Sequence, residues 1–160
     1  MIKIFHEGFA PEIAYAGDAG IDLKYNGLYS IPVVKNAIYK LRTGLFVEIP
    51  IGYCGIIFER SGLGSKYGYS IHGRVIDAPY RGEIIVILSV KNIEYLFDGE
   101  FDAFTHLPIY KKVESWELNP GDKIAQMVIL PCDSSWARAY KKEDLSSSDR
   151  GSKGLGSSGR

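Results

Sequence analysis

Short apolar runs separated by turn-forming residues constrain the fold of this chain more than any other feature of its sequence. Runs rich in Ile, Val, Tyr and Phe occupy residues 44–49, 53–58, 84–90 and 124–130. Residues that favour turns lie between such runs, at 26–27, 50–52, 98–99 and 119–122. Short β-branched and aromatic runs between turn signals indicate strands, and several in succession are typical of an all-β sandwich or barrel.

The remaining segments complete this organisation. One short helix is expected from about residue 63 to residue 67, ended by Gly68, because glycine commonly terminates helices. Residues 91–118 are rich in aromatic side chains, and we expect an inserted hairpin that packs on the core. A partner-binding surface is the alternative, because aromatics dominate interfaces as well as cores. We expect a core of residues 1–145 and a flexible C-terminal arm of residues 146–160, where Ser and Gly dominate.

Composition narrows the classes of protein. A length of 160 residues predicts one domain, and a formal net charge of zero gives no indication of nucleic-acid binding. Cys54 and Cys132 each lie in apolar surroundings and are expected to be buried free thiols of a reducing compartment. The sequence starts without the apolar segment of a signal peptide, and no apolar run is long enough to span a bilayer. We therefore expect a cytoplasmic protein that binds neither nucleic acid nor a membrane.

The arm has the composition of a phosphate clamp. Residues 150–160 combine glycines, serines and cationic side chains and contain little to bury. Glycine lets backbone N–H groups approach an anion closely, while hydroxyl and cationic groups add donors and charge. We expect an arm that is mobile when empty and ordered by a polyphosphate. A plain Gly/Ser linker is the alternative.

A second anion-binding candidate lies at residues 59–66. There a strand ends and Arg60, Ser61 and Gly62 lead into the expected helix, which would offer N–H groups, a hydroxyl and a guanidinium. The alternative is an N-capping serine beside a solvated arginine. Gln126 places an amide inside an apolar strand, where it needs a partner, either backbone or ligand.

Residues 72–83 suggest a binding hairpin. Residues 75–76 are expected to form a strand, residues 77–80 a tight turn, and residues from 83 onward the return strand. With Asp77 at the bend and Tyr80 on its arm, such a hairpin would hold a small planar ligand. The alternative is an ordinary Asx-type turn with a core tyrosine. Residues 15–23 combine small side chains with Asp22 and give a weaker signal.

Taken together and in this order, these segments resemble the five motifs of the trimeric dUTPase family. The matching segments are residues 19–23, 60–63, 75–82, 121–126 and 150–159. The resemblance implies a distorted jelly roll and a homotrimer whose three active sites are shared between subunits. It also implies hydrolysis of dUTP to dUMP and pyrophosphate by in-line attack of water on the α-phosphate. That reaction limits uracil incorporation into DNA and supplies dUMP for dTMP synthesis.

The resemblance also implies roles for individual residues. Asp77 would orient and deprotonate the water, and Tyr80 would pack against the deoxyribose and exclude a 2′-OH. The residues implied to bind phosphates are Arg60, Ser61, Gly62, Gln126, Arg150, Gly156 and Ser157. Those implied to contact uracil and deoxyribose are Gly73, Val75, Ile76, Tyr80 and Leu155, with Asp22 in support. Mg²⁺ would be held through the triphosphate and water, without dedicated protein ligands.

Four positions depart from the family pattern. Leu155 stands where an aromatic residue usually stacks on uracil, which predicts a weaker lid and a raised KM. Arg74 occupies a common glycine position, and we expect its side chain at the pocket wall. Pro79 removes a backbone donor just before the tyrosine, and Lys123 replaces a frequent arginine.

Two other functions compete with this interpretation. The dCTP deaminases share the fold but need a glutamate on the strand after the hairpin, where residues 84–88 are wholly apolar. A regulatory relative would engage a protein partner through residues 91–118 and would have catalysis as a secondary or lost activity. A P-loop NTPase is excluded because its Gly-x-x-x-x-Gly-Lys-[Ser/Thr] motif is absent.

Overall fold

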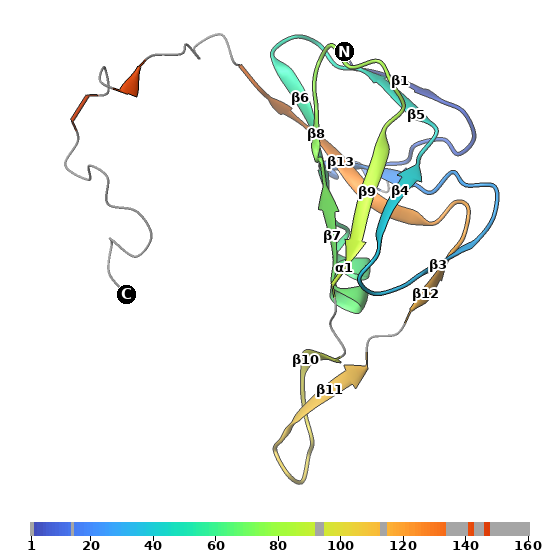
Figure 1. The fold of residues 1–160 in the computed structure, drawn as a ribbon, viewed down its shortest axis with the longest axis vertical. Coiled ribbons are helices and arrows are strands. Elements are labelled where there is room, and N and C mark those ends of the chain that lie inside the picture. Colours follow the sequence, from blue (N-terminus) through green and yellow to red (C-terminus); the bar gives the residue numbers. More distant parts are fainter. Residues whose placement is uncertain are drawn as a thin grey trace.

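Antiparallel β-structure dominates the chain (Figure 1). The computed structural model describes residues 2–13, 15–91, 95–112, 115–133, 141–142 and 146–147. The strands are β1 (Lys3–His6), β2 (Gly20–Lys24), β3 (Ile31–Val33), β4 (Ile38–Arg42), β5 (Leu45–Glu48), β6 (Tyr53–Phe58), β7 (Tyr69–His72), β8 (Val75–Ile76), β9 (Ile85–Val90), β10 (Tyr95–Phe101), β11 (Pro108–Lys112), β12 (Trp116–Leu118) and β13 (Lys123–Pro131). The helix α1 spans Ser61–Tyr67. The prediction of an all-β protein with one short helix is confirmed.

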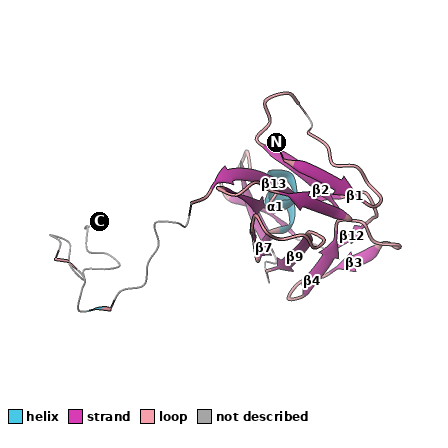
Figure 2. Cartoon of the chain, turned by 90° about the horizontal axis from the view of Figure 1, so that it is seen from above, coloured by secondary structure: helices cyan, strands magenta, loops and turns pink. Residues whose placement is uncertain are grey.

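Two sheets carry the residues of interest. A four-stranded sheet has the order β2-β13-β6-β8, and a three-stranded sheet has the order β4-β9-β7. The ladders β1–β5, β3–β12 and β10–β11 are two-stranded. The strands of the main body surround a common interior in both views (Figure 1, Figure 2).

Alternation of side chains along the strands builds the core. On β9, Val86, Leu88 and Val90 are buried, and on the facing sheet Ile57 and Met127 are buried with them. This is the period of two expected for a strand with one face toward the interior. Burial of each such side chain contributes about 1.5–3 kcal/mol before the entropy of ordering is set against it. The core therefore fixes which faces of β6, β9 and β13 remain available for binding.

Helix α1 begins earlier than the sequence suggested and ends where expected. Gly68 has a left-handed φ of +60°, and its N–H donates to the carbonyl of Gly64 at 3.0 Å. Arg60 is the N-cap residue and makes no side-chain capping bond. Ser61 is therefore the first helical residue, and the alternative that it is an N-capping serine is wrong.

Two of the turns expected between strands are confirmed. The N–H of Tyr53 donates to the carbonyl of Pro50 at 3.2 Å, which closes the turn between β5 and β6. The N–H of Asp122 donates to the carbonyl of Asn119 at 3.0 Å, which closes the turn before β13.

The turn expected at residues 98–99 is wrong. These residues lie inside β10, where the pairing with β11 shifts between Phe97 and Phe101 and Gly99 takes a φ of +92°. The chain reverses at residues 102–105 instead. There the Asp102 carboxylate accepts the N–H of Thr105 at 2.7 Å. Asp98 and Gly99 therefore lie at an irregularity in the ladder, and Asp102 caps the turn.

The β10–β11 hairpin extends away from the body of the molecule (Figure 1). The hairpin expected in residues 91–118 is present as β10–β11. The expectation that the stretch packs on the core is wrong for this hairpin. The exposed aromatic side chains are Tyr95, Phe97, Phe101, Phe104 and Tyr110. The end of the stretch packs inward, where Leu118 is buried and Trp116 stacks on Tyr67 with ring centroids 4.0 Å apart.

Residues 75–83 differ from the expected hairpin in their pairing. The strand at 75–76 and the turn at 77–80 are present, but β8 pairs with β6 while β9 pairs with β4 and β7. The segment therefore crosses from one sheet to the other. The reason is that β4 and β7 occupy both edges of β9, so β8 pairs with β6 instead.

Three further expectations can be compared with the structure. Cys54 and Cys132 are both free thiols, as expected, and Cys54 is buried. The expected burial of Cys132 is wrong. Cys132 is exposed because it lies just beyond the end of β13. In the described part of the chain, no helix has the length and apolar character needed to cross a membrane. The expected core boundary at residue 145 lies outside the described residues, as does the arm except for residues 146–147.

Candidate active site

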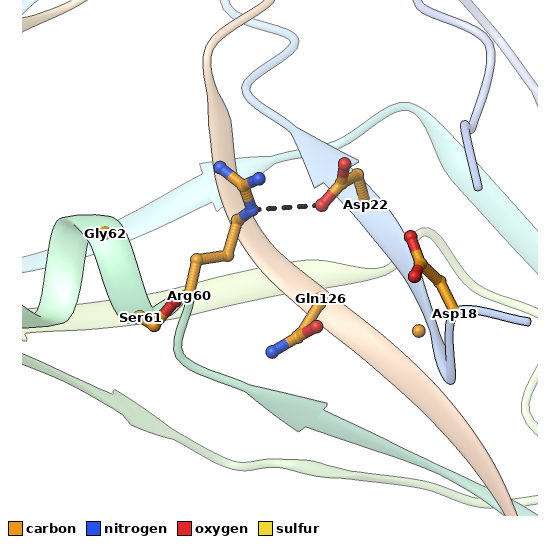
Figure 3. Close-up of a pocket in the computed structure, with 7 residues that line it drawn as sticks. Asp18, Asp22, Arg60, Ser61, Gly62 and Gln126 are labelled. Carbon is orange, nitrogen blue, oxygen red and sulfur yellow. Dashed lines mark ion pairs between the residues drawn. The ribbon is translucent and has the colours of Figure 1, made fainter. Parts of the chain in front are cut away.

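The first hollow collects the residues expected to bind phosphate. It is lined by Asp18, Gly20, Asp22, Arg60, Ser61, Gly62 and Gln126, which come from β2 and the loop before it, from β13, and from the start of α1 with its N-cap residue (Figure 3). The structure thus brings together Arg60, Ser61, Gly62 and Gln126 with the supporting Asp22. Arg150, Gly156 and Ser157 lie outside the described residues, as does Leu155.

Asp22 holds two cationic side chains, one of which lines this hollow. Its side chain is buried, and its two carboxylate oxygens form ion pairs with Arg60 Nε at 3.0 Å and with Lys123 Nζ at 2.7 Å. Figure 3 shows the Arg60 guanidinium directed at Asp22 across the hollow. The hydrogen bond and charge of Asp22 raise the pKa of Lys123. Asp22 therefore orients the Arg60 guanidinium at the place where an anion would bind, while its other oxygen holds Lys123, which does not line the hollow.

The backbone at Arg60 is fixed by a tyrosine from the neighbouring sheet. The N–H of Arg60 donates to the hydroxyl of Tyr69 at 2.7 Å, and that hydroxyl donates to the carbonyl of Ile124 at 3.1 Å. Burial raises the pKa of Tyr69, so the hydroxyl stays protonated and keeps its donor role. This relay connects the backbone of Arg60, just before α1, to β13.

From the sequence, the Gln126 amide was expected to have either a backbone or a ligand partner, and the structure shows a backbone partner. Gln126 Nε2 donates to the carbonyl of Glu59 at 3.1 Å, while the amide still lines the hollow. A Cβ on Gly20 would lie 3.0 Å from Gln126 Oε1, so a side chain there would require the amide to move by a few tenths of an ångström. Sequence reasoning singled out the segment around Gly20 and Asp18 but selected only Asp22 within it. The run of small residues at 16–20 was the signal in the sequence that could have identified Asp18 and Gly20 as lining residues.

A second hollow collects the residues expected to contact base and sugar. It is lined by Gly73, Val75, Ile76, Asp77, Tyr80, Glu83 and Ile85. All of the uracil- and deoxyribose-binding residues expected within the described part of the chain are present, together with the expected catalytic Asp77. Gly73 has a φ of +59°, a left-handed conformation that favours glycine.

Tyr80 is folded back across the turn that carries Asp77. Its N–H donates to the carbonyl of Asp77 at 3.0 Å, and its hydroxyl donates to the carbonyl of Glu83 at 2.9 Å. A Cβ on Gly82 would clash with the phenol ring. The ring position therefore depends on the glycine two residues later, which gives Gly82 a role in shaping the site.

Glu83 is a lining residue that sequence reasoning missed. Its carboxylate accepts Arg42 Nε at 2.9 Å and the N–H of Gly44 at 2.8 Å. These contacts tie the chain after the turn to the connection between β4 and β5. A single glutamate at the start of an apolar strand carried no signal of this role in the sequence.

Arg74 does not lie at the pocket wall, as was expected. Its guanidinium forms an ion pair with Glu59, and its side chain is absent from the lining of the second hollow. The physical reason is that Glu59 offers a carboxylate on the opposite side of the strand from the hollow.

Among the described residues, the two hollows have no lining residue in common. Within one chain the cationic group at Arg60 and the turn at Asp77 thus form two separate half-sites. We call them the phosphate half-site (Asp18, Gly20, Asp22, Arg60, Ser61, Gly62 and Gln126) and the base half-site (Gly73, Val75, Ile76, Asp77, Tyr80, Glu83 and Ile85).

This chain is similar to known proteins of one family. The dUTPase family model matches residues 6–96 and 109–159 and so leaves out the distal part of the β10–β11 hairpin. Deoxyuridine 5'-triphosphate nucleotidohydrolase of Tropheryma whipplei (strain Twist) is 34% identical over 98% of this chain and 93% of its own length. The enzyme of the same name from Candida albicans is 31% identical over 96% of this chain and 83% of its own.

Solved structures of phage enzymes are also similar. A point mutant of Staphylococcus bacteriophage 80alpha dUTPase, with dUpNHpp, has a TM-score of 0.73 at 28% identity and covers 100% of this chain and 99% of its own. A mutant dUTPase of phage phi11 of S. aureus, described with a structural Mg(II) ion, has a TM-score of 0.67 at 25% identity over 91% and 97% of the two chains.

The strand arrangement of this chain is the jelly-roll-like β fold of these structures, which places it in that class of β proteins. The family match covers most of the chain, and the matched residues include both half-sites. The chain belongs to the dUTPase family.

Proposed function

We propose that this protein is a dUTP diphosphatase that converts dUTP to dUMP and pyrophosphate in the cytoplasm. The observation that carries the proposal is the sorting of the expected site residues into one half-site with a fixed guanidinium and another built from a turn. A nucleoside triphosphate needs both kinds of surface, one for its charge and one for its base. The relatives named as deoxyuridine 5'-triphosphate nucleotidohydrolases support the choice of substrate.

In the phosphate half-site, Arg60, Ser61 and Gly62 hold the α- and β-phosphates with help from Gln126. Charge-assisted hydrogen bonds from a guanidinium to phosphate oxygens are strong, and Asp22 keeps that guanidinium in place beforehand. From the arm, Arg150, Gly156 and Ser157 close over the β- and γ-phosphates. The order and composition of the fifth motif support this role for residues 150–159.

In the base half-site, the backbone at Gly73, Val75 and Ile76 reads the edge of uracil. The ring of Tyr80 packs against the deoxyribose and leaves no room for a 2′-OH, so UTP is excluded. Leu155 covers the base from the arm. Its aliphatic side chain lacks the geometry of an aromatic stack, which is worth about 0.5–1.5 kcal/mol.

Asp77 is the general base of the reaction. It takes a proton from a water molecule whose oxygen forms a new bond to the α-phosphorus, while the bond from that phosphorus to the bridging oxygen breaks and pyrophosphate leaves. Phosphoryl-transfer enzymes achieve such displacements by positioning and charge stabilisation, without a covalent intermediate. The turn that fixes Asp77 against Tyr80 supplies that positioning.

The donor set fits Mg²⁺ bound through the substrate. Among the described residues, no group of three or more His, Cys, Asp or Glu side chains could hold a metal ion. Both oxygens of Asp22 already face Arg60 and Lys123. The proposed ligands of Mg²⁺ are triphosphate oxygens and water, as is common for this ion. When bound, Mg²⁺ supplies neutralisation of the triphosphate charge.

A homotrimer joins the half-sites of neighbouring chains. Apolar side chains stand exposed beside the base half-site, with Ile51 at 96%, Val75 at 57% and Tyr53 at 45% of their full exposure. Such patches mark contact surfaces between proteins. In a closed threefold ring each base half-site faces the phosphate half-site of the next chain, and the arm of the third chain covers the pair.

A protein partner at the β10–β11 hairpin is a second proposal. It is favoured by the exposed aromatic side chains there, since Phe97 and Tyr110 pack on one another with centroids 5.8 Å apart and leave their outer faces open. Aromatic residues are enriched in interface hot spots. This role is compatible with catalysis, because no described residue of the hairpin lines either half-site.

A steady-state assay of pyrophosphate release tests the proposed activity. With dUTP, UTP, dTTP and dCTP as substrates, dUTP alone should be cleaved efficiently. Ammonia release from dCTP would point to a deaminase instead. Binding of dUTP without turnover by the unaltered protein would overturn the proposal in favour of a regulatory relative.

A further inference from the structure

The turn that joins β7 to β8 has little support from strand pairing. β8 is two residues long, and its register with β6 consists of Gly55 with Ile76 and Ile56 with Val75. Segments with few backbone hydrogen bonds open locally at low cost. One further backbone bond extends this pairing, from the N–H of Ile57 to the carbonyl of Arg74 at 2.9 Å. The remaining support for the backbone at Gly73 and Val75 comes from side chains.

The charged side chains of Glu59 and Arg74 supply this support by hydrogen bonding to the backbone of Ile71 in β7. Glu59 Oε1 accepts the N–H of Ile71 at 2.9 Å, and Arg74 Nε donates to the carbonyl of the same residue at 3.0 Å. Arg74 Nη2 completes the ring by its ion pair with Glu59 Oε1. Because β7 is an edge strand, these side chains take the place of a missing neighbouring strand. We call this arrangement of Glu59, Ile71 and Arg74 the clamp.

The clamp is partly shielded from water and stays ionised near neutral pH. The side chains of Glu59 and Arg74 are 26% and 39% exposed. Burial raises the pKa of Glu59, but the Ile71 N–H and the Arg74 guanidinium lower it, and the net direction is downward. A guanidinium presents several donors in a fixed geometry, so lysine would not reproduce the ring.

The clamp lies behind the base half-site and touches the phosphate half-site at one point. Gly73 and Val75 line the base half-site, whereas Arg74 between them points away from it. On the other side, the carbonyl of Glu59 accepts the Gln126 amide at 3.1 Å. The sequence signal is Arg74 itself, which stands where the family commonly has glycine.

We propose that Glu59 and Arg74 are positioning residues for base recognition. Their clamp on Ile71 fixes the backbone of residues 73–75, against which uracil is read, and neither side chain touches the nucleotide. The proposal rests on the proposed dUTPase function and adds a specificity device to it. Loss of the clamp misaligns hydrogen bonds to the base and leaves the Asp77 turn, which has its own contacts, able to act.

Kinetics of clamp variants provide the first test. Arg74→Met should raise the KM for dUTP by about 5- to 20-fold, the loss of one or two aligned hydrogen bonds, with kcat within about 2-fold. The preference for dUTP over dCTP in kcat/KM should fall by a similar factor. Glu59→Gln keeps an oxygen for the Ile71 N–H and should be milder than Glu59→Ala. Lys3→Gln, which removes the exposed ion pair to Glu48, is the matched control and should change neither quantity.

Hydrogen exchange of the nucleotide-free protein provides a second test that does not depend on turnover. Amides of residues 69–76 should exchange faster in Arg74→Met and Glu59→Ala than in the unaltered protein and in Lys3→Gln. Unchanged exchange would overturn the clamp. Faster exchange with unchanged KM and base preference would show that the clamp stabilises the segment only, and would overturn its role in base recognition. Failure of the unaltered protein to cleave dUTP would instead refute the proposed function, and the exchange data would still judge the clamp.

Discussion

The two half-sites of this chain are organised by different physics. The phosphate half-site is held by side-chain charge, since Asp22 keeps Arg60 and Lys123 oriented from a buried position. The base half-site is held by backbone geometry, since Gly73 takes a left-handed conformation and the Asp77 turn closes on Tyr80. The difference fits the two tasks, because phosphate oxygens accept from any well-placed cation whereas a base edge requires donors and acceptors at fixed places.

This contrast predicts which substitutions affect which kinetic parameter. Loss of a cation from the phosphate half-site should weaken the binding of every nucleoside triphosphate and should depend on salt. A shift in the base half-site should change the choice among nucleotides. Asp77 stands apart because it belongs to the base half-site by position and to the chemical step by role.

The largest expected effect follows substitution of the general base. Asp77→Asn should lower kcat by about 10²- to 10⁴-fold, the usual contribution of general-base catalysis, while the affinity for dUTP is retained. Stopped-time pyrophosphate assays and calorimetric binding measure the two quantities. Asp102→Asn, at the tip of the β10–β11 hairpin, is the control and should behave like the unaltered protein. Equal losses of binding and turnover in Asp77→Asn would show that the residue is structural.

A smaller effect is expected in the phosphate half-site. Arg60→Met should lower kcat/KM by about 10- to 100-fold, the range for a lost hydrogen bond to a charged group, and equally for dUTP and its poorer analogues. The increase of KM with added salt should also become shallower, because screening acts on the removed charge. Titration of KM against ionic strength checks this, with Lys3→Met as a control. A change in nucleotide preference would break the proposed division between the half-sites.

The shape of the base half-site should respond to one added methyl group. Gly82→Ala should push the Tyr80 ring from its place and lower the preference for dUTP over UTP by about 10-fold, because packing alone rejects a hydroxyl weakly. The ratio of kcat/KM for dUTP to kcat/KM for UTP measures this preference. Gly64→Ala, where an added Cβ meets nothing within 4 Å, should keep the ratio. An unchanged ratio in Gly82→Ala would separate sugar discrimination from the position of Tyr80.

The smallest expected effect is on stability in acid. The pKa of Glu59 is lowered in the folded chain, so its contribution to stability is complete above the unfolded value of about 4.3 and is lost as the pH falls through the folded pKa. The melting temperature should drop by about 2–4 °C more in the unaltered protein than in Glu59→Gln when the pH is lowered from about 6 to about 3.5. Thermal melts of both proteins at the two pH values measure this difference. Equal drops in melting temperature would contradict the contribution of Glu59 to stability.

Sequence reasoning succeeded where a residue type needs a particular local backbone. Strands β6, β9 and β13 follow from their apolar runs, and Gly68 ends the helix because it tolerates a left-handed conformation. The candidate residues expected in the described part line the two hollows, although they were predicted through family motifs, and Asp18, Gly20, Glu83 and Ile85 were not among them. Their assembly into two hollows depends on sheet order, which no single segment encodes.

The failures of sequence reasoning share a physical cause. Arg74 was misplaced because its partner Glu59 is remote in sequence and meets it only through the pairing of β6 with β8. Glu83 was missed because its role depends on Arg42 and Gly44 of another connection. Contacts of this kind are set by tertiary structure, which a linear pattern of residue types does not contain.

Mixing two impaired variants, assayed below the KM for dUTP, tests the central claim most directly, namely that each active site takes its two half-sites from different chains. Asp77→Asn carries an intact phosphate half-site, and Arg60→Met carries an intact base half-site. Co-refolded at equal amounts, trimers with shared sites should recover about a quarter of the unaltered specific activity, because about one interface in four pairs the two intact halves. Activity no greater than the average of the two variants alone would show that each chain forms its site by itself, and would contradict the account.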